Sequence, residues 1–327
     1  MRTFVTTTIP VYNAQEFLQQ ALESVRRQTR QPDRVVVIDN CSTDSTPDIV
    51  KNFQGLPLEY IRNPRDLGVY GNFNRCLDFA AETDYLQILH ADDLILPPFY
   101  EKMVPLLENC EGFGLAWCLD ERVDENGRWL SVSGKANGKI EVLDKDVFLR
   151  SKAELGNQAF CATLLKTNGR PIPVRFPEDL LIVGDTIYWA KYGVNCKEIV
   201  TLNLPLAQYR WHSSNETTLR AMRRTKIQGL IVEERRIMEE VEALRDQPWS
   251  GFLRKQKLEG LFAARSGIKA KRFRQLGKAD YAELIDKTVR GYTGFPIWLS
   301  ARFLVELREI LVFKIGGRPR QPSNVYS

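Results

Sequence analysis

The stretch Tyr85-Leu86-Gln87-Ile88-Leu89-His90-Ala91-Asp92-Asp93 joins a run of mostly apolar residues to two adjacent acids. An apolar run of this length is typical of a buried strand, and α/β proteins bind ligands at the carboxyl ends of such strands. Two adjacent carboxylates at that edge favour a shared positive group, such as Mg²⁺ or Mn²⁺ beside a diphosphate. The alternative is an ordinary turn, with an aspartate capping the helix that begins near Pro97 and Pro98.

Strands and helices alternate at short intervals before this stretch. Residues rich in β-branched and aromatic side chains predict strands over 3–12, 34–38 and 58–62. Apolar spacing predicts a helix after each of them. We expect the first strand to break at Pro10, and Asn13 to cap the next helix with Glu16 as its partner. The alternation predicts an α/β fold with a mostly parallel sheet flanked by helical crossovers.

Composition is that of an ordinary globular protein. The 327 residues are 43% hydrophobic and 27% charged, and the six cysteines form no close pairs, which disfavours a zinc site or a disulfide scaffold. There is no G-x-G-x-x-G after the first strand and no P-loop motif, which disfavours dinucleotide enzymes and P-loop ATPases. The chain starts without a signal-peptide pattern and has no long apolar run, so we expect a cytoplasmic protein.

Charge is distributed unevenly along the chain. Residues 251–327 carry 16 Lys and Arg against 6 Asp and Glu, whereas residues 1–250 carry 30 against 35. We predict a helical, basic C-terminal region over 216–327, with an amphipathic segment near 295–315 that lies in a bilayer interface or docks on the preceding domain. The basic excess indicates an anionic partner, a membrane surface or nucleic acid, and we expect the membrane, at the inner face of the plasma membrane, and not nucleic acid; the alternative is a solvated helix face.

Several motifs in order carry a resemblance to a known family. They are Ile9-Pro10-Val11-Tyr12-Asn13, Asp39-x-x-Ser42-x-Asp44-x-Thr46, Asn63-x-x-x-x-Gly68 and His90-Ala91-Asp92-Asp93. Their order and spacing resemble those of family 2 glycosyltransferases with the GT-A fold, over roughly residues 3–215. The resemblance implies a catalytic domain over 1–215, with a nucleotide-binding half (1–110) and an acceptor half (111–215). His90 stands where the family often has an acid, and Phe73 stands near a usual arginine.

The resemblance also implies roles for the residues at the predicted sheet edge. Pro10 and Tyr12 would line the base and ribose pocket, and Asp39 would accept a hydrogen bond from a ring N–H of the base. Asp92 would contact the ribose, and Asp93 would ligate a divalent metal, Mn²⁺ or Mg²⁺, that bridges the two phosphates. Asp39 could instead cap the following turn, and Tyr12 could be a core aromatic.

Two residues further along complete the implied site. Asp185 follows Gly184 at the start of a predicted helix, where the family has its catalytic base, and a carboxylate can take the proton of an acceptor hydroxyl. Asp185 could instead be an N-cap, and Glu178-Asp179 is a rival acidic pair. His212, in the family-like Tyr-Arg-x-His arrangement, is predicted as a second metal ligand or a diphosphate contact.

The resemblance therefore predicts a metal-dependent glycosyltransferase. It would move a sugar from a nucleotide-diphosphate donor, favoured as a UDP-sugar, to a hydroxyl of a sugar or lipid-linked glycan acceptor, with inversion. Such a reaction serves cell-surface polysaccharide or lipid-linked glycan synthesis. One alternative is a sugar nucleotidyltransferase, which would need a Gly-rich, basic loop after the first strand. Another is a non-catalytic nucleotide-binding scaffold.

Overall fold

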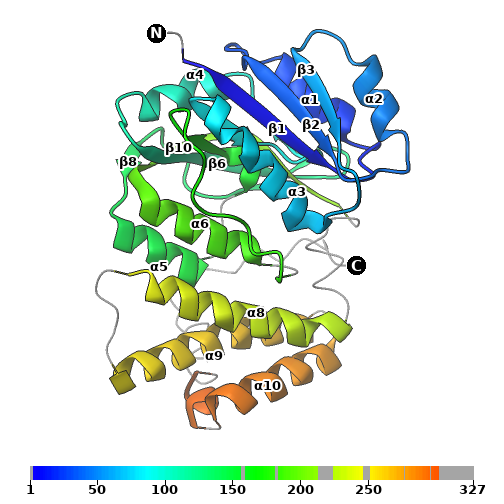
Figure 1. The fold of residues 1–327 in the computed structure, drawn as a ribbon. Coiled ribbons are helices and arrows are strands. Elements are labelled where there is room, and N and C mark those ends of the chain that lie inside the picture. The colour runs from blue at the N-terminus through cyan, green and yellow to red at the C-terminus, as the bar shows by residue number, and fades with distance from the viewer. Residues whose placement is uncertain are drawn as a thin grey trace. The chain divides into compact units, whose positions relative to one another are not determined.

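The structure is a computed structural model that describes residues 3–155, 159–180, 183–212, 224–245, 251–275, 277–294 and 296–301. The chain divides into two compact units, residues 1–215 and 216–327, which are described separately below. Figure 1 shows their helices and strands.

The first unit begins with four parallel strands in the order β3-β2-β1-β4. They are β1 (Val5–Val11), β2 (Arg34–Asp39), β3 (Leu58–Arg62) and β4 (Tyr85–Ile88), and they alternate with α1 (Leu18–Arg26), α2 (Thr46–Asn52) and α3 (Gly68–Leu77). The chain moves one way across the sheet from β1 to β3 and then returns to β4. Right-handed crossovers therefore place α1 and α2 on one face and α3 on the other, as Figure 1 shows.

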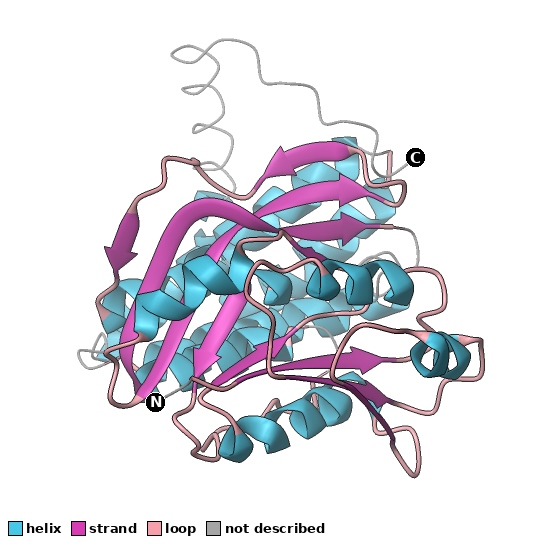
Figure 2. Cartoon of the chain, turned by 90° about the horizontal axis from the view of Figure 1, so that it is seen from above, coloured by secondary structure: helices cyan, strands magenta, loops and turns pink. Residues whose placement is uncertain are grey.

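The sheet then continues with strands of both directions. The elements are η1 (Asp78–Glu82), β5 (Leu94–Ile95), α4 (Phe99–Met103), η2 (Val104–Leu107), β6 (Phe113–Asp124), β7 (Trp129–Val132), β8 (Ile140–Val142), α5 (Lys145–Leu155), η3 (Phe160–Ala162), β9 (Thr163–Lys166), α6 (Gly184–Asn195) and β10 (Cys196–Trp211). Strand β9 runs antiparallel between β4 and β6, whereas β6 and β10 are parallel. The described residues thus form one mixed, ten-stranded sheet flanked by helices, with its strands in magenta in Figure 2.

The core lies between this sheet and its helices. The β-branched residues of β2 and the apolar stripe of α1 are fully buried, as the periodicity predicts. The Asp124–Gly127 turn joins β6 to the antiparallel strand β7, and the two strands form a β-hairpin. Gly127 has φ 78°. Glycine adopts this left-handed conformation without steric strain because it has no Cβ atom.

The predicted break at Pro10 is wrong, because β1 continues through Pro10 to Val11. The amide of Asn40 donates to the carbonyl of Val11, so Val11 faces β2 and Pro10 faces the β4 side. Strand β4 has ended there: the last bond to β1 runs from Leu89 N to Thr8 O. The missing N–H of Pro10 therefore breaks no ladder bond.

The predicted cap at Asn13 is also wrong. Helix α1 begins only at Leu18, and its first flanking residue, Phe17, makes no side-chain cap bond. Asn13 instead has φ 49°, and its side-chain oxygen accepts a hydrogen bond from the amide of Thr43. Asparagine tolerates this left-handed conformation. Asn13 is therefore hydrogen-bonded to the loop after β2 and does not cap the helix.

The second unit is helical, with α8 (Arg224–Ala243), α9 (Gly251–Gln275) and α10 (Ala279–Thr293). Its core includes Ile231, Met238, Phe262, Ile285 and Val289. Within the described part of the chain, no helix is long and apolar enough to cross a membrane. Residues 296–301 are helical, and the rest of the predicted amphipathic segment near 295–315 lies outside the described residues.

Candidate active site

The predicted nucleotide residues follow three neighbouring parallel strands. Val11, at the end of β1, pairs with Asp39 at the end of β2, and Thr8 pairs with Ile88 at the end of β4. The carboxyl ends of these strands meet at one edge of the sheet, so Tyr12, Asp39 and residues 90–93 all lie along it. Tyr12 is 55% exposed there, whereas Asp39 is fully buried.

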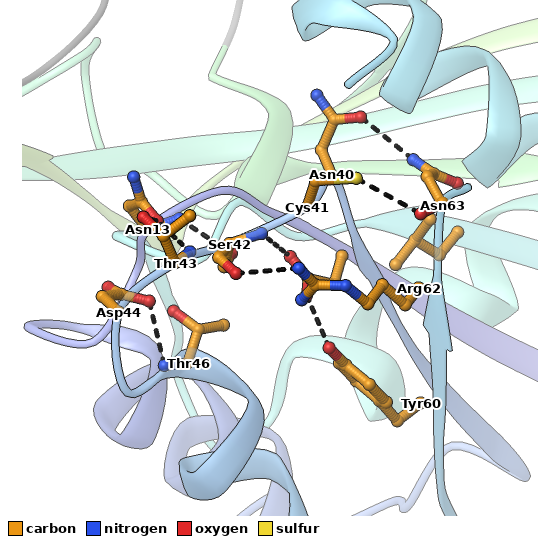
Figure 3. A network of polar contacts seen from close by, with 12 residues as sticks. Asn13, Asn40, Cys41, Ser42, Thr43, Asp44, Thr46, Tyr60, Arg62 and Asn63 are labelled. Atoms are coloured by element: carbon orange, nitrogen blue, oxygen red, sulfur yellow. Dashed lines mark hydrogen bonds and ion pairs between the residues drawn. The ribbon is translucent and has the colours of Figure 1, made fainter. Parts of the chain in front are cut away.

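Asp39 is held by three hydrogen-bond donors. Its Oδ1 accepts from the amide of Ser42 at 2.8 Å, which is the turn-capping contact that the sequence left open. Its Oδ2 accepts from the hydroxyl of Tyr60 at 2.5 Å and from Nη1 of Arg62 at 2.7 Å. Figure 3 shows this network, with the Arg62 guanidinium also bonded to the carbonyl of Ser42. A buried carboxyl group with a cationic partner thus lies at the edge where a base is predicted to bind.

The motif Asp39-x-x-Ser42-x-Asp44-x-Thr46 has a clear structural purpose. Three of its side chains accept hydrogen bonds from three consecutive amides in the loop after β1. The pairs are Ser42 Oγ with Asn13 N (2.9 Å), Thr46 Oγ1 with Ala14 N (2.8 Å) and Asp44 Oδ2 with Gln15 N (3.0 Å). In the other direction, the side-chain oxygen of Asn13 accepts a hydrogen bond from the amide of Thr43. The two loops are therefore bonded together, which holds Tyr12 at the edge beside Asp39.

The fully buried Thr46 gives a stability test of this loop pairing. In Thr46→Val the shape is kept but the amide of Ala14 loses its acceptor. We expect the free energy of unfolding to fall by about 2 kcal/mol, the usual cost of an unsatisfied polar group. Urea denaturation measures it. The matched control is Ser45→Ala, which removes an exposed hydroxyl from the same loop and should change stability by less than about 0.5 kcal/mol. Equal effects of the two variants would contradict the loop pairing.

The acidic corner after β4 brings together three side chains that could hold a metal ion. One ligand atom each of His90, Asp92 and Asp93 lies within 4.8 Å of the others. Burial, with the charge of Asp92, raises the pKa of Asp93 well above its usual value. Burial also acts to raise the pKa of Asp92, but hydrogen bonding from His212 and the nearby His90 lower it overall. Repulsion between the two carboxylates is thus a feature of this corner.

Strand β10 closes this corner from the other end of the domain. Nε2 of His212 lies 3.1 Å from Oδ2 of Asp92, so the structure brings His212 to the predicted site. The amide of Arg210 donates to Oδ1 of Asp93 at 3.0 Å, and its Nε donates to the carbonyl of Asp92 at 3.0 Å. The Arg210 guanidinium is buried and lies 4.8 Å from the ring centre of Phe17. A buried cation therefore stands behind the two acids.

Asp185 lies in the first turn of α6, as predicted. Its Oδ1 accepts from the amide of Thr186 at 2.8 Å within that turn, whereas the N-cap residue of α6 is Val183. Burial is the main cause that raises the pKa of Tyr209, and the charges of Asp93, Asp92 and Asp185 add to it. Burial lowers the pKa of Lys152 to about 7, although the negative charge of Asp185 acts to raise it. The charge of Asp185 therefore raises the pKa of the same Tyr209 hydroxyl as the charges of Asp92 and Asp93.

Comparison with known proteins places this site in a family. The profile of Glycosyl transferase family 2 matches residues 6–152, which contain β1 to β4, the paired loops and the acidic corner. Residues 6–152 form a glycosyltransferase family 2 domain. The chain is a glycosyltransferase, and its mixed sheet with flanking helices is the GT-A fold.

Individual relatives support this assignment. The succinoglycan biosynthesis protein ExoO of Rhizobium meliloti is 25% identical and covers 79% of this transferase and 70% of its own length. Staphylococcus aureus TarS, residues 1–349 with UDP-GlcNAc, is 16% identical and has a TM-score of 0.55 over 88% of this chain and 92% of its own. The mannosyltransferase PcManGT of Pyrobaculum calidifontis, with GDP-Man and Mn²⁺, is 17% identical with a TM-score of 0.52, covering 96% and 81%. The two structures show likeness of fold.

The acidic corner of this transferase fits a divalent metal. Oδ2 of Asp93 and Nε2 of His90 are buried polar atoms without a hydrogen-bond partner among the described residues. Such atoms are rare in folded proteins and call for an explanation such as an ion. Burial lowers the pKa of His90, so its imidazole is neutral, the form that binds metals. Carboxylate and imidazole groups are both metal ligands, so this set of side chains suits a divalent ion.

Sequence reasoning missed several residues of the site. The contacts of Tyr60 and Arg62 with Asp39 arise from the pairing of β3 with β2, where Arg62 is the neighbour of Asp39 in register. A charged residue ending the strand beside an acidic one is the signal that was available. The contacts of Arg210 with the acidic corner join residues far apart in the chain, and no local sequence pattern predicts these contacts.

Proposed function

We propose that this enzyme transfers a sugar from a nucleotide-diphosphate sugar to an acceptor hydroxyl with inversion, using a divalent metal. The observation that carries the proposal is the edge shared by Tyr12, Asp39 and the corner of Asp92 and Asp93. A base, a ribose and two phosphates can be held along such an edge in that order. Asp185, whose charge acts on Tyr209 together with those of the corner, supplies the base.

The donor is a UDP-sugar in this proposal. Tyr12 and Pro10 line the base and ribose pocket, Asp39 accepts from a ring N–H of the base, and Asp92 contacts the ribose. The buried carboxyl oxygens of Asp39, one of them bonded to Arg62, are hydrogen-bond acceptors and suit the N–H of uracil. The complex of TarS with UDP-GlcNAc supports a uridine nucleotide, whereas the complex of PcManGT contains GDP-Man.

Asp93 would hold the metal, Mn²⁺ or Mg²⁺, with His90 and His212 as the nearby imidazoles. When bound, the metal supplies positive charge that neutralises the diphosphate leaving group. Manganese in the PcManGT complex supports this choice. Arg210 fixes the corner by binding Oδ1 of Asp93 and the carbonyl of Asp92, which leaves Oδ2 of Asp93 for the ion.

Transfer is then a single displacement. Asp185 takes the proton of the acceptor hydroxyl as the oxygen attacks the anomeric carbon. The new glycosidic C–O bond forms while the bond from that carbon to the phosphate oxygen breaks, and the nucleoside diphosphate leaves with the bonding electrons. Attack opposite to the leaving group inverts the anomeric configuration.

The acceptor in this proposal is a sugar or lipid-linked glycan of polysaccharide synthesis. The relative ExoO is a succinoglycan biosynthesis protein, which supports a polysaccharide product. A lipid-linked acceptor would bring the enzyme to an anionic membrane surface, and the excess of basic residues over 251–327 suits that contact. The contact is peripheral in this proposal.

A donor panel tests the proposal. Purified enzyme with Mn²⁺ is given UDP-GlcNAc, UDP-glucose, UDP-galactose or GDP-mannose, and release of the nucleoside diphosphate is measured. We expect release from at least one UDP-sugar, suppressed by EDTA and restored by Mn²⁺. UDP with Mn²⁺ should also raise the melting temperature, because a ligand that binds only the native state stabilises it. Release that persists in EDTA would contradict the metal, and release from GDP-mannose alone would contradict the uridine donor.

A further inference from the structure

Helix α3 is hydrogen-bonded to Phe176, Glu178 and Gly184, which precede Asp185 in the chain. Tyr70 and Asn74 stand four residues apart on α3, so they lie on the same face of the helix. The hydroxyl of Tyr70 accepts a hydrogen bond from the amide of Gly184 at 2.8 Å, in the buried interior. Gly184 is the first residue of α6 and the immediate neighbour of Asp185. One hydrogen bond thus joins α3 to the residue beside the proposed base.

Asn74 binds the same segment several residues earlier. Its Oδ1 accepts from the amide of Phe176 at 2.8 Å, and its Nδ2 donates to the carbonyl of Phe176 at 3.1 Å. The same Nδ2 donates to Oε1 of Glu178 at 2.9 Å. The side chain therefore satisfies both backbone groups of one residue, as a neighbouring strand would. This pairing fixes the backbone of the segment and not only its side chains.

Close packing supports these bonds. The rings of Tyr70 and Phe176 are parallel, with centres 6.0 Å apart, and Phe176 stacks on Tyr188 of α6 at 3.8 Å. A Cβ atom at Gly184 would come within 2.9 Å of the Tyr70 ring and 3.0 Å of Pro177. The tyrosine thus approaches the backbone as only a glycine allows. The start of α6 has little room to shift while Tyr70 is in place.

The opposite side of α3 is bonded to the nucleotide edge. The side-chain amide of Asn72 donates to the carbonyl of Ile38, the residue before Asp39, at 3.1 Å. Its oxygen accepts from Nδ2 of Asn63 at 2.9 Å, and the amide of Asn63 donates to the carbonyl of Asp39 at 2.8 Å. Helix α3 therefore connects the end of β2 to the start of α6.

We propose that Tyr70 and Asn74 are positioning residues that hold Asp185 at a fixed distance from the bound donor. The proposal rests on the role of Asp185 in the proposed function. Neither residue touches the reacting atoms in this scheme. Tyr70 fixes the first amide of α6, and Asn74 fixes the segment that leads to it. A base displaced by a fraction of an ångström loses much of its rate advantage, because proton transfer needs close alignment.

The test measures release of UDP from the UDP-sugar that the donor panel finds most active. We expect Tyr70→Phe and Asn74→Ala each to lower kcat about 10-fold, while KM for the donor stays within about twofold. The matched control is Tyr85→Phe, which also removes a buried hydroxyl bond, from Tyr85 to the carbonyl of Val104, at the far end of β4. Its kcat should stay unchanged. Melting temperatures of the three variants report any general loss of stability.

A double-mutant cycle separates positioning from a general structural effect. Once Asp185→Asn has removed the base, its placement no longer matters, so adding Tyr70→Phe should not lower the residual rate further. An additional 10-fold loss in that background, or full kcat in Tyr70→Phe alone, would overturn the positioning role. If Asp185→Asn itself kept full kcat, Asp185 would not be the base and both proposals would fail. If only Asp185→Asn were impaired, the positioning role alone would fail.

Discussion

Asp185→Asn is expected to lower kcat for sugar transfer by about three orders of magnitude, within the range of general-base catalysis, and to leave the fold intact. An amide cannot take the proton of the acceptor hydroxyl. It does keep the oxygen that accepts from the amide of Thr186, so this hydrogen bond in the first turn of α6 is retained. Steady-state kinetics with the active UDP-sugar measure kcat, and circular dichroism and the melting temperature report the fold. KM for the donor should change little.

The rival acidic pair gives the control for this experiment. Asp179 and Glu178 precede Asp185 in the same segment, and both are exposed. Glu178 already binds the side-chain amide of Asn74, a contact that suits a structural role. Asp179→Asn should therefore keep nearly full kcat. Loss of transfer in Asp179→Asn with normal transfer in Asp185→Asn would assign the base to Asp179.

The residues that sequence could place at the nucleotide edge are those next to strongly apolar strands. Buried parallel strands such as β2 and β4 have mostly apolar sequences, and the residues that follow them lie at the carboxyl edge. This reasoning brought Asp39, Asp92 and Asp93 to one edge without any coordinates. The GT-A fold, expected from the motifs, is confirmed by the match to the family profile and by the solved structures.

What sequence could not predict depends on the register of distant segments. The bond from Arg210 to Asp93 joins positions 117 residues apart, and the bond from Gly184 to Tyr70 joins positions 114 apart. Neither position has a periodic or turn signature that names its partner. The errors at Pro10 and Asn13 are local ones, in which neighbouring strands and loops overrode the usual preference of the residue.

Asp93→Asn is expected to abolish the response to Mn²⁺ and to lower transfer by at least about a thousandfold. Asp93 is fully buried, and its pKa is raised by burial and by the charge of Asp92. Keeping this carboxylate ionised is costly until a cation is bound, so the neutral amide should leave the metal-free protein as stable as before, or more stable. Thermal unfolding with and without Mn²⁺ measures both effects. The unchanged enzyme should gain about 2.7 kcal/mol at a metal concentration 100 times Kd.

An aspartate at the opposite end of β4 provides the control. The carboxylate of Asp84 accepts a hydrogen bond from the amide of Phe4 at 2.8 Å and is not part of the acidic corner. Asp84→Asn should keep both the stabilisation by Mn²⁺ and the rate of transfer. Because the metal-free stability of Asp93→Asn is expected not to fall, inactivity of that variant cannot be attributed to unfolding. An Asp93→Asn enzyme that is still stabilised by Mn²⁺ would remove Asp93 from the metal site, and one that unfolds without metal would make Asp93 a structural residue.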